Sequence, residues 1–219
     1  MANPTKEDAL KGLENPMGPY LEAESIDGEL LAKKLNEIGF CTIWTREPGG
    51  MGCPVSEKIR EIIIDPKNDI CDRAEALLFA ASRAQHIVKL IRPNLKNGLN
   101  VISDRFVLSS YVYQGIARKL GLCRVKTLNN FACQGLEPDI IFLLDLDVIK
   151  GQKRTLNKKK DRIEREDIPF HQKIRGGFLK LAEKNPTIVI IDAELSEKRV
   201  CKEVLKHTLR IIKEKKEKI

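Results

Sequence analysis

Three arginines, each near an acidic residue or a glycine loop, are the residues best suited to chemistry in this sequence. Arg46 and Arg105 each follow a short apolar run, Cys41–Trp44 and Asn100–Ser103, that predicts a buried strand. Arg83 lies on a long predicted helix. A guanidinium group can pair with two phosphate oxygens at once. Because ligands bind at the carboxyl ends of strands in open α/β sheets, the set predicts a site for a phosphate-bearing molecule.

Two of the neighbouring features also have a purely structural explanation. Asp104 and Arg105 are adjacent, and they could form only a surface salt bridge that caps the next helix. Phe79 lies four positions before Arg83, so both side chains project from one helix face. Phe79 could then stack on a base whose edge Arg83 binds, or it could simply pack in the core. The residue pattern leaves these alternatives open.

The elements that must position these residues alternate between strand and helix. Helices are expected at 27–38, 56–64, 72–92, 124–134, 169–183 and 196–213, and strands at 20–23, 41–44, 100–103, 140–144 and 187–191. Pro93 is expected to stop the third helix. Strands separated by helices predict an α/β fold with a parallel sheet wound by right-handed crossovers.

Composition and charge point to one domain with a local anion site. The chain has 219 residues, of which 42% are hydrophobic, and no linker is visible, so a single domain is expected over residues 20–219. Residues 1–19 lack periodicity and are expected to be a disordered leader. The net charge of +8 is concentrated in residues 150–165 and 206–218. Because these basic stretches lack interleaved aromatic residues, nucleic-acid binding is not expected.

The cysteines and the apolar runs indicate a cytoplasmic protein. The six cysteines form no CxxC pair and are widely spaced, which favours reduced thiols over zinc ligands or a disulfide framework. The first residues are polar and carry prolines, unlike a secretory signal. No apolar run reaches the ~20 residues that span a bilayer, so no membrane partner is expected.

Five segments together resemble the thymidylate kinase family. They occur in the family's order, and the run DRFVLSSYVYQG is the most diagnostic of them: Thr45–Gly50, Glu75–His86, Asp104–Gly115, Gly135–Asp139 and Asp161–Glu166. The resemblance implies a P-loop-kinase-like parallel sheet with helices on both faces and a mobile basic lid at about residues 150–165. It also implies a homodimer that transfers the γ-phosphoryl group of ATP to dTMP with Mg2+, giving dTDP.

The resemblance also implies roles for individual residues. The dTMP site would consist of Asp27, Arg46, Phe79, Arg83, Arg105, Ser110, Tyr113 and Gln114. In it the arginines of the strand ends would hold the phosphate, Phe79 would stack on thymine, and Arg83 and Gln114 would read the base. Tyr113 would crowd the sugar 2′ position, and Asp27 would meet the 3′-hydroxyl. The catalytic set would be Arg46, Asp104, Arg105, Arg154 and Arg162, with Asp104 near the metal, and ATP would meet Gly28, Lys153 and Arg154.

The sequence departs from the family at the ATP loop. The pattern G-x-x-x-x-G-K-[ST] supplies backbone N–H groups and a lysine for the phosphates. Glu24–Gly28 matches its beginning, with Ser25 in place of a glycine, but the chain contains no Gly-Lys dipeptide. About seven residues of the loop are missing relative to that pattern. The alternative hypothesis is therefore a nucleotide-binding protein that recognises dTMP with impaired catalysis.

Overall fold

A computed structural model describes residues 20–24, 28–154 and 161–216, and the expected leader, residues 1–19, lies outside them. The fold is built on a five-stranded parallel sheet in the order β2-β3-β1-β4-β5. The strands are β1 (Tyr20–Glu24), β2 (Thr42–Arg46), β3 (Asn100–Asp104), β4 (Ile140–Asp145) and β5 (Ile188–Asp192). All five predicted strands are thus confirmed, each ending one or more residues later than expected.

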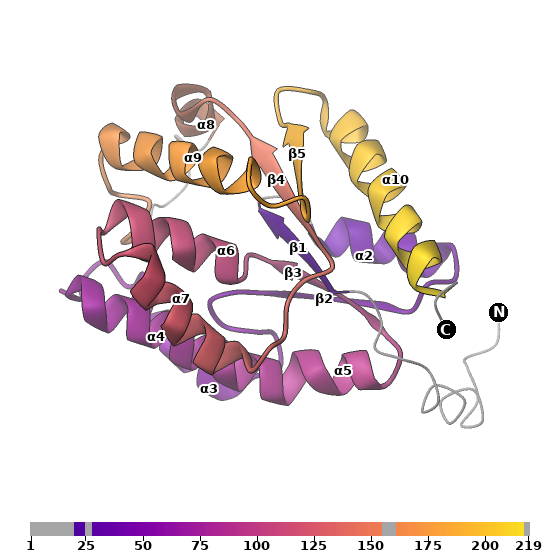
Figure 1. The fold of residues 1–219 in the computed structure, drawn as a ribbon, viewed down its shortest axis with the longest axis horizontal. Helices are drawn as coiled ribbons and strands as arrows, with labels where there is room; N and C mark the ends of the chain where they lie inside the picture. The colour runs from indigo at the N-terminus through magenta and orange to yellow at the C-terminus, as the bar shows by residue number, and fades with distance from the viewer. Residues whose placement is uncertain (1–19, 25–27, 155–160, 217–219) are drawn as a thin grey trace.

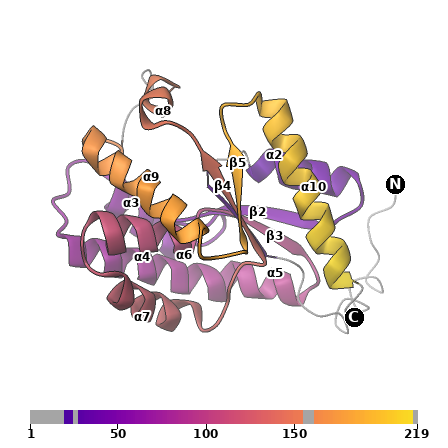
Figure 2. The same ribbon diagram turned by 45° about the horizontal axis from the view of Figure 1, so that its top comes forward.

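Helices cover both faces of this sheet (Figures 1 and 2). They are α2 (Gly28–Glu37), α3 (Pro54–Ile64), α4 (Asp72–His86), α5 (Arg92–Lys96), α6 (Val107–Ser110), α7 (Leu122–Cys133), α8 (Val148–Arg154), α9 (Ile168–Ala182) and α10 (Glu197–Lys216), with π-helical turns η2 (Ile87–Ile91) and η3 (Tyr111–Ala117). Helices α2 and α10 lie on one face, and α4 to α7 and α9 lie on the other. Among the described residues, no helix has both the length and the apolar character needed to cross a bilayer.

Alternating residues of the central strands supply separate hydrophobic clusters on the two faces of the sheet. On β3, Ile102 packs with the core of α2 and α10, whereas Val101 packs with the core of η2 and α6. On β4, Phe142 belongs to the first core, and Ile141 belongs to a third cluster beside α9. Because successive strand residues point to opposite faces, a continuous apolar run is required where both faces are covered. This explains why these strands could be recognised in the sequence.

The expectation that Pro93 stops the third helix is wrong. The helical path continues from α4 through the π-helical turn η2 into α5, which holds Pro93 in its first turn. A proline inside a continuous helix lacks the N–H for one backbone hydrogen bond and its ring crowds the carbonyl four residues earlier, so the path must adjust at this point. The Arg92 N–H donates to the Ile87 carbonyl, five residues earlier, and the Asn94 side chain donates to the Leu90 carbonyl at 2.7 Å. The wider turn and this side chain therefore accommodate the proline.

One ion pair fixes α9 to the carboxyl end of β4. Arg175 Nε donates to Asp145 Oδ1 at 2.7 Å, and Nη2 donates to Oδ2 at 2.9 Å. This hydrogen-bonded guanidinium lowers the pKa of the Asp145 carboxyl. A carboxylate whose pKa is lower in the folded state stabilises the fold above its unfolded-state pKa and loses this effect as the pH falls through the folded-state pKa.

We therefore expect Arg175→Ala to lower the free energy of unfolding by about 1 kcal/mol at neutral pH, since the pair is partly exposed. The difference from the wild type should shrink below about pH 4, where aspartates of the unfolded chain take up protons. Urea denaturation of both proteins between neutral pH and the acid limit measures this. A difference that stays constant across that range would contradict the role given to Asp145.

Candidate functional site

The carboxyl ends of β2 and β3 meet in one corner, which brings two of the predicted arginines together. Arg46 is paired in register with Asp104, and the Glu47 N–H donates to the Asp104 carbonyl at 2.9 Å. Arg105 follows Asp104 directly. The ends of β2 and β3 are thus neighbours in the sheet, and the next residues of both strands leave the sheet at this corner.

Arg105 is held in an unusual backbone conformation. Its φ angle is +67°, in the left-handed region that residues other than glycine rarely adopt. The Ser103 hydroxyl donates to its carbonyl at 2.7 Å. Its Nη1 donates to Ser109 Oγ at 3.4 Å and to the Tyr113 hydroxyl at 3.5 Å, and its guanidinium lies 5.5 Å from the centre of the Tyr113 ring. Strained residues held by their surroundings concentrate at functional sites, so the charge of Arg105 is presented in a fixed direction.

A third arginine at this corner was not identified from the sequence. Arg60 on α3 donates through Nη1 to the Pro48 carbonyl at 2.8 Å, and Arg46 Nη2 pairs with Glu57 Oε2 at 3.2 Å. Burial and the nearby charge of Arg46 lower the pKa of Arg60. Two guanidinium groups that repel each other in this way favour an anion between them. The sequence feature that could have identified Arg60 is its position in the second turn of the helix that follows the glycine loop.

Arg83 is the buried centre of a hydrogen-bond network. It is 1% exposed, and Nε donates to Glu47 Oε2 at 2.7 Å. Nη1 donates to Ser110 Oγ at 3.0 Å and also to Asn129 Oδ1, and Nη2 donates to the Phe106 carbonyl at 3.0 Å. Arg83 therefore joins the loop after β2, the helix after β3 and α7. Ser110, which the resemblance implies to be a dTMP-binding residue, contacts Arg83 within this network.

A buried histidine completes the support behind the glycine loop. His86 is fully buried, with Nδ1 3.1 Å from Glu47 Oε1 and Nε2 2.8 Å from Thr45 Oγ1. A Cβ on Gly50 would lie 2.4 Å from its ring, so the loop requires glycine at that position. Glu47 thus accepts from both Arg83 and His86, which fixes the loop that carries Arg46.

A second network lies beside Gln114 and includes a lid residue. Gln114 Nε2 donates to Glu75 Oε1 at 2.9 Å, and Gln114 is 1% exposed. Its Oε1 is buried and has no hydrogen-bond partner among the described residues. Arg162 Nη2 pairs with Glu75 Oε2, and its Nε donates to the Ile63 carbonyl at 2.8 Å. The structure therefore places Arg162 against α3 and α4, in the network around Glu75.

For most of the remaining predicted residues, the structure gives a position in the fold but few contacts. Phe79 is half-buried on α4, one turn before Arg83, and Lys153 is exposed on α8. Arg154 ends α8. β1 ends at Glu24 and α2 begins at Gly28, so three residues connect them. Those residues, Asp27 included, lie outside the described part of the chain, and Gly28 itself packs so closely on Trp44 that a Cβ would lie 2.6 Å from its ring.

The described residues contain no ready-made metal cage. Within them, no group of three or more His, Cys, Asp and Glu side chains is arranged to hold a metal. Arg46, Arg60 and Arg105 together form what we call the arginine corner. The half-buried carboxylate of Asp104, beside this corner, is a hard oxygen ligand of the type that Mg2+ prefers. Mg2+ usually takes one or two carboxylates together with phosphate oxygens, so a single carboxylate here fits that ion.

Comparisons with a family model and with curated proteins give one consistent description. The family model "Thymidylate kinase" matches residues 25–204. Three curated relatives named Thymidylate kinase come from Halothermothrix orenii, Fervidobacterium nodosum and Lactobacillus acidophilus. They are 41%, 43% and 44% identical to this chain over 198, 194 and 201 residues. The matches cover 85%, 85% and 86% of this chain and 94%, 96% and 92% of the three relatives.

Proposed function

The chain belongs to the thymidylate kinase family, and we infer from this membership that it transfers the γ-phosphoryl group of ATP to dTMP, giving dTDP. The observation that carries the inference is the match to the family over residues 25–204, which includes both strand ends of the arginine corner. The fold is the family's P-loop-kinase fold, an α/β sheet with helices on both faces. The relatives' names give no support to the alternative of an impaired nucleotide-binding protein.

We propose that the dTMP phosphate binds at the arginine corner. Arg46 and Arg105 leave neighbouring strand ends, and Arg60 lies beside Arg46. Guanidinium groups bind phosphate oxygens through two parallel hydrogen bonds, and a fixed array of them stabilises the charge that develops during phosphoryl transfer. Phosphate binding would also relieve the repulsion between Arg46 and Arg60.

We propose that the thymine base is read beyond this corner by residues of α4 and η3. Phe79 would stack on the base, and Arg83 would bond its edge. The buried amide oxygen of Gln114 supports a base contact, because an unpaired buried acceptor is costly and thymine offers an N–H donor at N3. Tyr113 would limit the sugar to 2′-deoxyribose, and Asp27 would contact the 3′-hydroxyl.

We propose that Mg2+ is held by Asp104 together with phosphate oxygens of the bound nucleotides. The ion, when bound, neutralises charge on the transferring phosphoryl group. Gly28, Lys153 and Arg154 are proposed to contact ATP, with the exposed ammonium of Lys153 available to its phosphates. Arg162 is proposed to contribute by holding the lid segment against Glu75 and the end of α3.

We further propose a homodimer in the cytoplasm. Helices α3, α4 and α7 lie side by side (Figures 1 and 2) and carry exposed apolar side chains: Val55, Ile62, Leu77 and Phe131, the last 83% exposed. Such a surface favours burial against another protein surface. The free cysteines are consistent with a reducing compartment. Analytical ultracentrifugation tests the dimer, and a sedimenting mass of one chain would contradict it.

The activity is tested with a series of nucleoside monophosphates. With ATP and Mg2+ present, we expect ADP release with dTMP and much slower release with dCMP, whose N3 carries no hydrogen and cannot donate the hydrogen bond that Gln114 Oε1 is proposed to accept. A hydrogen bond lost to a buried polar group lowers kcat/KM by about tenfold or more. Equal rates with dTMP and dCMP would contradict the proposed base contact, and calorimetric binding of dTMP without ADP release would contradict the kinase assignment.

A further inference from the structure

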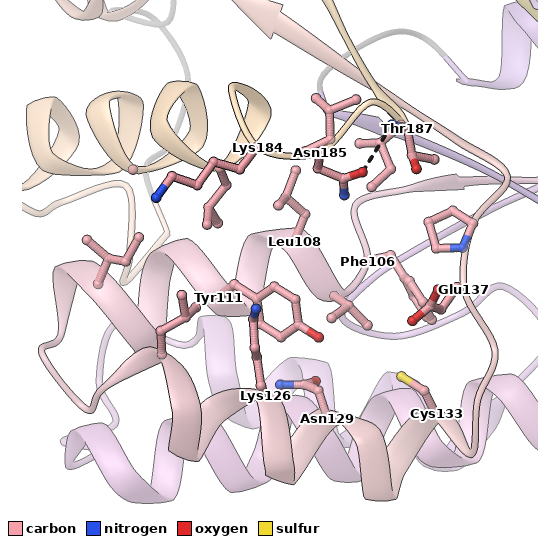
Figure 3. Close-up of a pocket in the computed structure, with 18 of the residues that line it drawn as sticks. Phe106, Leu108, Tyr111, Lys126, Asn129, Cys133, Glu137, Lys184, Asn185 and Thr187 are labelled. Atoms are coloured by element: carbon pink, nitrogen blue, oxygen red, sulfur yellow. Dashed lines mark hydrogen bonds between the residues drawn. The ribbon is translucent and has the colours of Figure 1, made fainter.

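A large cavity lies away from the arginine corner, between α7 and α9 (Figure 3). Its volume is about 1070 Å³, and α6 and η3 contribute its floor. Its inner end is lined by Ile141, the second residue of β4, and by Ile188, the first residue of β5. The cavity therefore opens at the amino-terminal edge of the sheet, whereas the proposed dTMP phosphate site lies at the carboxyl edge.

The charges around this cavity are strongly one-sided. Its lining includes four exposed lysines, Lys126 from α7 and Lys173, Lys180 and Lys184 from α9 or its end, against one carboxylate, Glu137. None of the four lysines forms an ion pair with a described residue. Figure 3 shows Lys126 and Lys184 extending from opposite sides into the space between the two helices. Cations gathered around a concave site attract an anion. Until an anion binds, the positive charge of the four lysines has no opposite charge in contact with it among the described residues.

The floor of the cavity is apolar and aromatic. Leu108, Leu136 and Ile188 are buried around it, and the half-buried ring of Tyr111 lies between the two helices. The Lys126 ammonium is 5.7 Å from the centre of that ring. A pocket with an apolar floor and a few polar groups at its rim is the usual form of a small-molecule site.

We propose that this cavity is a second ligand site, which binds an organic polyphosphate. The flat apolar part of the ligand would lie on the floor at Tyr111, and its phosphates would meet Lys126 and Lys184. The charge at the rim excludes the basic end of this chain as the occupant, since residues 213–218 are lysines and glutamates in which lysine predominates. The volume exceeds what a single inorganic phosphate requires and matches a nucleotide-sized molecule.

The cavity shares a wall with the proposed thymine site. Asn129, which lines the cavity, accepts a hydrogen bond from Arg83 through Oδ1. Phe106, which also lines it, accepts from Arg83 through its carbonyl and lies with its ring 5.3 Å from the Arg83 guanidinium. A ligand that moves Asn129 or Phe106 would therefore change the position of Arg83. This coupling rests on the proposed function, whereas binding in the cavity does not.

Binding is tested with the intact protein saturated with dTMP and a non-hydrolysable ATP analogue, so that both proposed substrate sites are filled. Trinitrophenyl-UTP is the fluorescent probe, and we expect saturable binding that weakens as salt rises. The double variant Lys126→Ala/Lys184→Ala should bind the probe about tenfold more weakly, as two lost charge contacts of roughly 0.7 kcal/mol each imply. The matched control Lys198→Ala/Lys202→Ala, on exposed positions of α10, should bind it as the wild type does.

A cavity-filling variant gives an independent test. Gly176 on α9 lines the cavity, and a Cβ there would meet no atom within 4 Å. Gly176→Phe should therefore fold, because other residues favour a helix interior over glycine, and should abolish probe binding. Unchanged binding in Gly176→Phe or in the lysine variant would overturn the site. Inorganic tripolyphosphate that binds as tightly as the probe would overturn the role of the apolar floor.

The coupling is measured as the dTMP affinity with and without saturating probe. A change in the dissociation constant of dTMP that disappears in Gly176→Phe supports it, and by linkage dTMP should change the affinity for the probe by the same factor. An unchanged dTMP affinity would overturn the coupling alone. If dTMP did not bind at all, the proposed function would fail, and probe binding to the cavity would still be measurable.

Discussion

Arg105→Met is expected to lower kcat/KM for dTMP by about 10²–10³-fold, which is the cost of removing one preorganised donor to a developing charge. The guanidinium is presented from a residue with a φ angle of +67°, beside the end of the strand that carries Arg46. A methionine there retains the length of the side chain but can donate no hydrogen bond to a phosphate oxygen. Steady-state kinetics with ATP in excess measure the loss.

Two variants separate catalysis from folding in this experiment. Arg105→Lys keeps the positive charge but cannot donate two parallel hydrogen bonds, so its kcat/KM should lie between those of Arg105→Met and the wild type. Arg124→Met removes an exposed arginine on α7 and is expected to leave kcat/KM unchanged. If both Arg105→Met and Arg124→Met retain the kcat/KM of the wild type, the dTMP phosphate does not bind at the arginine corner.

Arg83→Met is expected to lower the free energy of unfolding by about 3–5 kcal/mol, because it removes the guanidinium partner of the buried Glu47 carboxylate and leaves it only the contact with His86. Arg83 and Glu47 are 1% and 2% exposed in their side chains, and their atoms approach to 2.7 Å. The other acceptors of Arg83 include the Phe106 carbonyl and Ser110, which would also lose their donor. Urea denaturation measures the loss.

A double variant distinguishes this ion pair from general loss of packing. Glu47→Gln combined with Arg83→Met removes both charges, so it should be more stable than the sum of the two single changes predicts. Additive losses would show that the pair is not coupled. The double variant should also bind dTMP more weakly than the wild type, since the loop that carries Arg46 depends on Glu47.

Most of the strands could be predicted because they contain short apolar runs, as β4 does, whereas β1 (YLEAE) alternates apolar and acidic residues. Ile140–Asp145 supplies clusters on both faces of the sheet, and only a strand covered on both faces needs such a run. The path through Pro93 could not be predicted, because it depends on a π-helical turn and on one Asn94 side-chain bond. Local propensity favours a break there, and the surrounding contacts override it.

The candidate site could be predicted in part for a similar reason. Arg46 and Arg105 lie at the ends of strands, and the carboxyl ends of parallel strands lie at the same edge of the sheet regardless of the loop conformations. The contacts of Arg83 with Asn129 and with the Phe106 carbonyl join segments far apart in the chain, and no local pattern encodes them. Arg60 was missed because an arginine on an amphipathic helix is ordinarily a solvent-exposed residue.

The short connection between β1 and α2 makes phosphoryl transfer the central question. Only three residues join Glu24 to Gly28, and the chain contains no Gly-Lys dipeptide. Backbone N–H groups and a lysine at this position ordinarily hold the phosphates of the donor. The other groups available for this task are the proposed Asp104–Mg2+ contact and the cations of α8 and the lid.

The most direct measurement is the transfer of label from γ-labelled ATP to dTMP by the purified full-length protein with Mg2+. Products are separated by chromatography, and Arg105→Met serves as the matched control. We expect labelled dTDP that accumulates with time in the wild type and is strongly reduced in the variant. Tight binding of dTMP with no labelled dTDP above the rate without protein would contradict the kinase assignment.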